Sequence, residues 1–289
     1  MIWDDYMAIP HFGVLLVRLL ESRGADIGWL ASASAVSEEE LYSVVGGLMP
    51  TPDQLHGLAR ALGLRVADLC VMSGVPVLER DVPRETAAGS ELARLIHIMV
   101  ALPPDQRDRI HDLIMRELPQ ASYAADNSPP LRACDQRVGS FGEMLIIMLR
   151  DNRNLYSLDS VLWVLGALTH GTVALSHSDL RSIANGVMPL SPTLLTGFAT
   201  VLGIPVRDLA AVVGGDLPGT GLGSDPLADE MAELLWTCRG LTVGQIGAVC
   251  ETAEAMLVAV PADGSVDGWN RVFHHHGTWW GTPKESTSD

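Results

Sequence analysis

The most constraining feature of this sequence is an internal repeat, in which two stretches of chain carry similar residues in the same order. Residues 46–50 read GGLMP and residues 185–189 read NGVMP, 139 positions later. The runs that follow match with an offset of 140 at Leu55, Ala59, Leu62, Gly63, Asp68 and Leu69. A repeat that persists over this length predicts that the chain folds as two copies of one unit.

The repeat also predicts the domain organisation. Phe12 and Gly13 recur as Phe141 and Gly142, which extends the similarity upstream. We expect the first copy at 1–120, with a five-helix unit at 11–75 and a helical pair at 89–120. We expect the second copy at 140–260, with a unit at 140–214 and a helical pair at 225–258. Residues 121–139 contain an Asn-Ser-Pro-Pro run typical of a linker, and residues 261–289 are expected to form a tail.

Helical periodicity dominates the chain, which predicts the fold class. Apolar residues recur on one face of residues 14–20 and again of residues 53–62, and no run alternates as a strand would. Pro52 and Pro192 follow Thr51 and Ser191, an order that favours a helix start. The expected fold is all-α and internally duplicated. Two tryptophans of the predicted second helices, Trp29 and Trp163, are expected in the core.

Composition excludes several classes of protein. Hydrophobic residues make up 47% of the 289 residues, which is typical of a folded chain, although the net charge is −16. No stretch of 18 apolar residues is free of charge, so no membrane span is expected. The start, with Asp4 and Asp5, does not resemble a secretory signal. The cysteines lack close pairs, which favours reduced thiols in the cytoplasm; they are Cys70, Cys134, Cys238 and Cys250.

A spaced motif occurs once in each copy. In the second copy, residues 175–186 read LSHSDLRSIANG, with Ser176 and Asp179 at capping-box spacing. In the first copy, residues 36–47 read VSEEELYSVVGG, with Ser37 and Glu40 at the same spacing. The pattern consists, in order, of an aliphatic residue, Ser, three variable positions, Leu, two variable positions, an aliphatic residue and then Asn-Gly. It resembles the repressor-like helix–turn–helix family, of the lambda-repressor, Cro or XRE type.

The resemblance implies a DNA-binding transcriptional regulator whose third helix enters the major groove. In the second copy, the side chains that could reach base edges are Ser176, His177, Ser178 and Arg181. Arg150 and Arg153, before the second helix, suit phosphate contacts. Members of this family bind paired DNA half-sites as dimers. In this chain the twofold symmetry would come either from the duplication or from association of two chains through 89–120 and 225–258. Double-stranded DNA is the expected partner.

Two departures from the family pattern leave another function open. The first copy places three carboxylates, Glu38–Glu40, at the start of its third helix, where a phosphate lattice would repel them. The second copy has about five additional residues between its second and third helices. With the net charge of −16, these features suit a protein-interaction module that has lost DNA reading and binds a partner or another copy. A weaker alternative is small-molecule sensing by the helical pairs.

Charge by position favours the second copy for DNA contact. Residues 140–214 hold four Arg against five acidic residues, whereas residues 11–75 hold four against seven. Elsewhere the chain offers little chemistry. The histidines at 274–276 lack a ligand partner at metal-binding spacing, so no metal or cofactor is expected. No nucleophile and base occur at a catalytic spacing, so the chain is not expected to be an enzyme.

Overall fold

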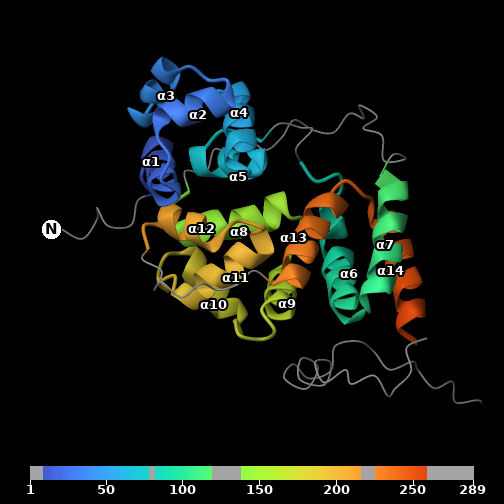
Figure 1. Cartoon of the computed structure of the whole chain (residues 1–289). Helices are drawn as coiled ribbons and strands as arrows, with labels where there is room; N and C mark the ends of the chain where they lie inside the picture. The colour runs from blue at the N-terminus through green and yellow to red at the C-terminus, as the bar shows by residue number, and fades with distance from the viewer. Residues whose placement is uncertain (1–8, 78–81, 119–137, 216–224, 259–289) are drawn as a thin grey trace, which may run out of the picture.

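A computed structural model describes residues 9–77, 82–118, 138–215 and 225–258 of the chain. Within these ranges the chain forms fourteen α-helices and no β-strand (Figure 1). The all-α prediction is therefore confirmed for this part of the chain. The predicted tail at 261–289 and residues 121–137 of the predicted linker lie outside the described residues. None of the helices in these ranges is both long and apolar enough to cross a bilayer.

The first unit consists of α1 (Phe12–Arg23), α2 (Ile27–Ser34), α3 (Glu38–Val45), α4 (Pro52–Leu62) and α5 (Val66–Ser73). Side-chain caps begin α2, α3 and α4. Ser37 and Glu40 form the predicted capping box of α3, and Thr51 with Gln54 forms another at α4. Gly13 allows close packing of α1 on α3, because a Cβ there would lie 2.3 Å from the carbonyl oxygen of Val44.

The second unit consists of α8 (Phe141–Ile147), α9 (Leu158–Leu168), α10 (His177–Ala184), α11 (Pro192–Leu202) and α12 (Val206–Val213). A π-helical turn, Met148–Asn152, continues α8. Gly142 lies against α10, and a Cβ at this position would be 1.9 Å from the carbonyl oxygen of Ile183. Ser140 also donates a hydrogen bond to the carbonyl of Ala184 at 2.7 Å. Both contacts fix the end of α10 to the start of α8.

The helical pairs consist of α6 (Gly89–Ala101), α7 (Pro104–Glu117), α13 (Pro226–Cys238) and α14 (Val243–Val258). They do not form separate lobes. Helix α6 packs against α9 of the second unit as well as against α13 and α14, and α13 packs against α11. Buried apolar residues from both units and both pairs join in one continuous hydrophobic core. Three of the four cysteines, Cys70, Cys238 and Cys250, are described, and all three are buried.

The prediction that both tryptophans belong to the core is wrong. Trp29 is 44% exposed and Trp163 is 36% exposed. Each lies on an outward-facing position of its helix, while Leu30 and Val164, the next residues along the chain, are buried. Trp163 is partly covered by His97 of α6, with the two ring centroids 5.9 Å apart. The periodicity of apolar residues does not predict whether a tryptophan at the edge of an apolar stripe is buried or exposed.

Two ion pairs join the first unit to the second in a reciprocal way. Asp208, near the start of α12, accepts a hydrogen bond from Nε of Arg23 at 3.1 Å. Asp68, at the equivalent place in α5, accepts one from Nη2 of Arg153 at 2.7 Å. Each arginine follows or ends the first helix of its own unit, and each aspartate belongs to the other unit. The contacts of α1 with α12 and of α5 with α8 and its π-helical turn surround these pairs.

Candidate nucleic-acid interface

Helix α10 presents one face to the outside because its opposite face is anchored in the core. Leu180 and Ile183 are buried, and α10 packs on α8 and α9. Its N-terminus is closed by the predicted capping box. The backbone N–H of Ser176 donates to Oδ2 of Asp179 at 2.8 Å, and the N–H of Asp179 donates to Oγ of Ser176 at 3.2 Å. The bonds that Oδ2 of Asp179 accepts from the backbone N–H and the hydroxyl of Ser176 hold the pKa of this carboxyl below its ordinary value.

The outward face of α10 carries the four side chains predicted to reach bases, and all four are exposed: Ser176, His177, Ser178 and Arg181. Arg181 forms no ion pair or side-chain hydrogen bond with any other described residue. Nε2 of the His177 imidazole lies 2.7 Å from Oδ1 of Asp159 in α9. The hydroxyls of Ser176 and Ser178 are 2.7 Å apart. The face therefore offers one uncompensated guanidinium and a set of small hydrogen-bonding groups.

Arg150, predicted to contact phosphate, lies at the surface but is already compensated. Its Nε donates to Oδ1 of Asp151 at 2.8 Å, and its guanidinium lies 5.9 Å from the ring centroid of Tyr156. The side chain is partly exposed. A phosphate would have to displace Asp151, or share the guanidinium with it, to gain this contact. Arg150 remains a candidate for DNA contact, but it brings little net positive charge.

The predicted phosphate contact of Arg153 is wrong, because this side chain is fully buried. Both of its Nη atoms bind the carboxylate of Asp68, and Nη2 also donates to the carbonyl of Leu202. Asn152 donates a further hydrogen bond to Asp68 at 2.8 Å. Burying a carboxylate without a partner is costly, so Asp68 requires this arginine. An aspartate inside the apolar run of residues 66–72, repeated at Asp208, is the sequence signal that could have indicated it.

The turn between α9 and α10 is longer than its counterpart, as the sequence predicts. It covers residues 169–176, whereas residues 35–37 connect α2 to α3. His170 and Gly171 both adopt positive φ, at 49° and 74°, which lets the chain reverse. Nε2 of His170 lies 2.9 Å from Oδ2 of Asp225, the N-cap of α13. This bond lowers the pKa of Asp225 and ties the turn to the second helical pair.

The equivalent helix of the first unit presents different chemistry. Glu38, Glu39 and Glu40 are exposed in the first turn of α3. The side-chain amide of Gln54 donates to Oε1 of Glu40 at 3.2 Å, but no cation pairs with any of the three within the described residues. Three large apolar side chains are also exposed, Tyr42 within α3 and Leu48 and Met49 just after it. Three exposed carboxylates without a pairing cation disfavour contact with the phosphates of DNA.

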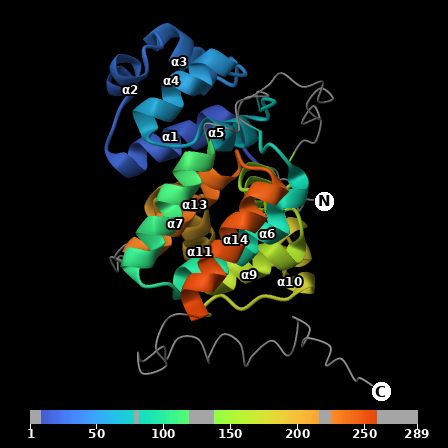
Figure 2. The ribbon, with the colours of Figure 1, turned by 90° about the vertical axis from the view of Figure 1, so that its right-hand side faces the viewer.

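The two third helices lie far from each other in the molecule. Both views place α3 at one end and α10 at the opposite end, with α5 between them (Figures 1 and 2). The interface with the reciprocal Arg–Asp pairs lies in this central region, because α5 and α12 each supply one of the aspartates. One unit can therefore carry a binding face independently of the other.

Comparison with models of protein families, with curated proteins and with solved structures gave no match to this chain. The resemblance to the repressor-like family consequently stays a prediction from the spaced motif. Within the described ranges, no group of three His, Cys, Asp or Glu side chains is placed to hold a metal ion.

Proposed function

We propose that this protein is a cytoplasmic DNA-binding transcriptional regulator built from two fused repressor-like helix–turn–helix modules, and that it contacts DNA through α10. The observation that carries the proposal is the outward face of α10, with Arg181 uncompensated beside two hydroxyls and one imidazole. Arginine can bind a guanine edge with two hydrogen bonds, and hydroxyls can bind either groove edge. Helix α3 shares only the N-cap serine, Ser37, with this face. Glu38, Glu39 and Tyr42 stand at the positions of His177, Ser178 and Arg181.

We further propose that the two modules arose by duplication within the chain. Helices of equal length at corresponding positions in the two modules support this origin. Helices α3 and α10 each span 8 residues behind a capping box, and α4 and α11 each span 11 residues that begin with proline. Gly63 and Gly203 then end α4 and α11 in the left-handed conformation, at φ 61° and 63°. The reciprocal pairs of Arg23 with Asp208 and of Arg153 with Asp68 follow the same correspondence.

Affinity for DNA is expected to be modest because few cations are available to phosphate. Arg153 is buried, and Asp151 and Asp159 accompany Arg150 and His177. The logarithm of the binding constant falls with the logarithm of salt by about 0.9 for each phosphate neutralised. With roughly two or three such contacts, the slope should lie near −2 to −3. Steeper dependence would mean that cations outside this face take part.

The experiment begins with selection of duplexes from a random pool by the full chain at 50 mM salt, followed by anisotropy titration of the best duplex. Arg181→Ala should weaken binding by about tenfold or more, as loss of a bidentate base contact does. Arg109→Ala on α7 is the matched control, since Arg109 is also an exposed helical arginine. Glu38→Ala should leave the affinity unchanged. Full affinity in the Arg181→Ala variant would overturn the assignment of α10.

A second candidate function is a protein-interaction module. The large apolar side chains of Tyr42, Leu48 and Met49, all exposed in or just after α3, favour it. Large apolar side chains exposed close together along the chain are typical of interfaces between proteins. In this case the chain would retain no duplex at 50 mM salt, and sedimentation would show self-association that Leu48→Ser with Met49→Ser abolishes. A monomeric chain that binds a selected duplex excludes this function.

A further inference from the structure

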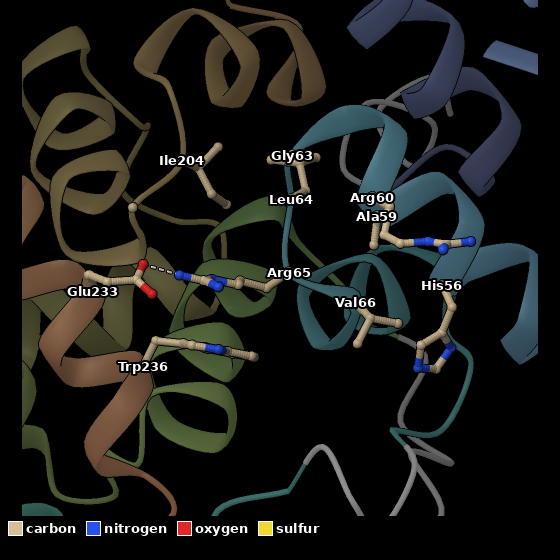
Figure 3. Close-up of a pocket in the computed structure, with 11 residues that line it drawn as sticks. His56, Ala59, Arg60, Gly63, Leu64, Arg65, Val66, Ile204, Glu233 and Trp236 are labelled. Carbon is tan, nitrogen blue, oxygen red and sulfur yellow. Dashed lines mark hydrogen bonds and ion pairs between the residues drawn. The ribbon is translucent and has the colours of Figure 1, made fainter. Parts of the chain in front are cut away.

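We propose that the cavity between the two units and α13 is a binding site for a small organic anion with an apolar body. Its volume is about 730 Å³, within the range of sites that hold small molecules. Residues from α4, the α4–α5 and α11–α12 connections, α5 and α13 line it (Figure 3). The proposal concerns a site that α10 does not reach, and it holds whether or not the chain binds DNA.

The walls of the cavity combine apolar and cationic groups. Apolar lining comes from Ala59, Leu64, Val66 and Ile204, together with the indole of Trp236. On the opposite side of the cavity from Trp236, His56 and Arg60 extend from one face of α4 (Figure 3). The imidazole Nδ1 of His56 donates to the carbonyl of Pro52 at 2.8 Å. A ligand with an apolar body can therefore rest on the lining while its charged group meets a cation.

The charges of the lining side chains indicate that the charged group of the ligand is an anion. The lining includes two arginines, Arg60 and Arg65, and one acid, Glu233. Arg60 forms no ion pair or side-chain hydrogen bond with any residue the structure describes. A surplus of positive charge in a cavity is notable in a chain with a net charge of −16. A local surplus of positive charge attracts anions.

Arg65 is the group that we expect to bind the anion. It reaches across the cavity to the α13 wall, where Nη2 binds Oε2 of Glu233 (Figure 3). The Glu233 side chain is 59% exposed, so its carboxylate can turn into solvent at little cost. A ligand carboxylate, sulfonate or phosphate would then take the place of the Glu233 oxygen on the guanidinium, with the geometry that such pairs prefer.

Trp236 keeps Arg65 in position when Glu233 leaves. The guanidinium of Arg65 lies 4.9 Å from the ring centroid, within the distance of a cation–π contact. Two further guanidiniums surround the same indole, Arg239 at 3.4 Å and Arg153 at 5.2 Å. Arg153 is itself fixed by Asp68. The anion site is thus preorganised by the buried ion pair that joins the two units.

Two fluorescent probes test the site. 1-Anilinonaphthalene-8-sulfonate carries an apolar body and one anionic group, whereas N-phenyl-1-naphthylamine has nearly the same body without the charge. The full chain should bind the sulfonate at one saturable site. Arg65→Gln should weaken this binding about tenfold, as loss of a charge-assisted hydrogen bond does, and Arg60→Gln should weaken it less. Binding of the neutral probe should not change in either variant.

Glu233→Gln is the decisive variant, because it alters an exposed side chain and removes the competing anion. It should bind the sulfonate more tightly than the wild-type chain. Arg109→Gln on α7, away from the cavity, should change nothing. Circular dichroism and a thermal midpoint for each variant verify that it is folded. Equal affinity of the sulfonate for the wild-type, Arg65→Gln and Glu233→Gln chains, or a parallel loss of the neutral probe, would overturn the proposal.

Discussion

The buried pair of Arg153 and Asp68 allows the sharpest prediction about stability. Arg153→Met removes the guanidinium and replaces the apolar stem of the arginine with an unbranched apolar side chain. The carboxylate of Asp68 then stays in a fully buried position with only Asn152 as a side-chain donor. Removing one member of a buried ion pair costs ~3–5 kcal/mol. Since domains are stable by about 5–15 kcal/mol, this single substitution should consume a large part of the free energy of unfolding.

The reciprocal pair provides the matched control. Arg23 is 25% exposed and Asp208 is 5% exposed, so water can solvate Asp208 in part after Arg23→Met. We expect a loss of about 1–2 kcal/mol there, between the values for exposed and buried pairs. The double variant Arg153→Met with Asp68→Leu removes both charges together. It should regain most of the stability, because an apolar pair of similar volume replaces a buried ion pair at little cost.

Urea unfolding followed by circular dichroism at 222 nm measures these differences, provided that the slope with denaturant stays constant. Two results would refute the reasoning. One is a loss below about 1 kcal/mol in Arg153→Met, which would mean that Asp68 is solvated or relaxes outward. The other is a double variant less stable than Arg153→Met alone, which would mean that the apolar replacement packs badly rather than that an unpaired charge was the cause.

Three further predictions follow from packing and protonation. Gly142→Ala should destabilise the chain by more than about 2 kcal/mol, because its Cβ would overlap the α10 backbone. Gly166→Ala, which has open space around it in α9, should stabilise the chain by about 0.5–1 kcal/mol. Equal urea midpoints for the two variants would contradict this prediction. Burial lowers the pKa of His97 below 6.5, so the unfolded chain takes up the proton first, and stability should be complete above pH 6.5 and fall as acidification approaches the folded pKa. His97→Gln should flatten this part of a stability–pH curve, and an unchanged curve would exclude His97 as its origin. Burial raises the pKa of Cys238 and of Cys250 to about 12, so iodoacetamide at pH 8 should label them only after unfolding, as peptide mass spectrometry would show; rapid labelling of the native chain would contradict their burial.

Local structure was predictable from sequence because its causes are local. Capping boxes at Ser37 and Ser176 require only residues three positions apart, and the structure contains both. The helix that starts at Pro52 ends at Leu62, where the apolar periodicity gives way to Gly63. The longer turn before α10 follows from residue spacing alone. These features depend on short-range steric and hydrogen-bonding rules, which the chain carries in any context.

Contacts between units were not predictable in the same way. Arg153 follows a helix and resembles a surface residue by composition, yet it is buried because Asp68, 85 positions earlier, lies against it. The exposed positions of Trp29 and Trp163 depend on which edge of each helix meets a neighbour. The cavity around Arg65 and Trp236 joins segments from both halves of the chain. Periodicity defines a buried face, but it does not name the residue on the opposite side.

Supplying both units from one chain has a consequence for how the protein can change over generations. In a symmetric dimer of identical chains, one substitution alters both outward faces at once. On the proposed duplication, a substitution here alters a single face, so α3 has Glu38, Glu39 and Glu40 where α10 has His177, Ser178 and Asp179. The interior positions do not share this freedom, because Arg23 and Asp208, like Arg153 and Asp68, constrain each other across the two halves. Selection can therefore differentiate the two ends of the molecule while their common frame is retained.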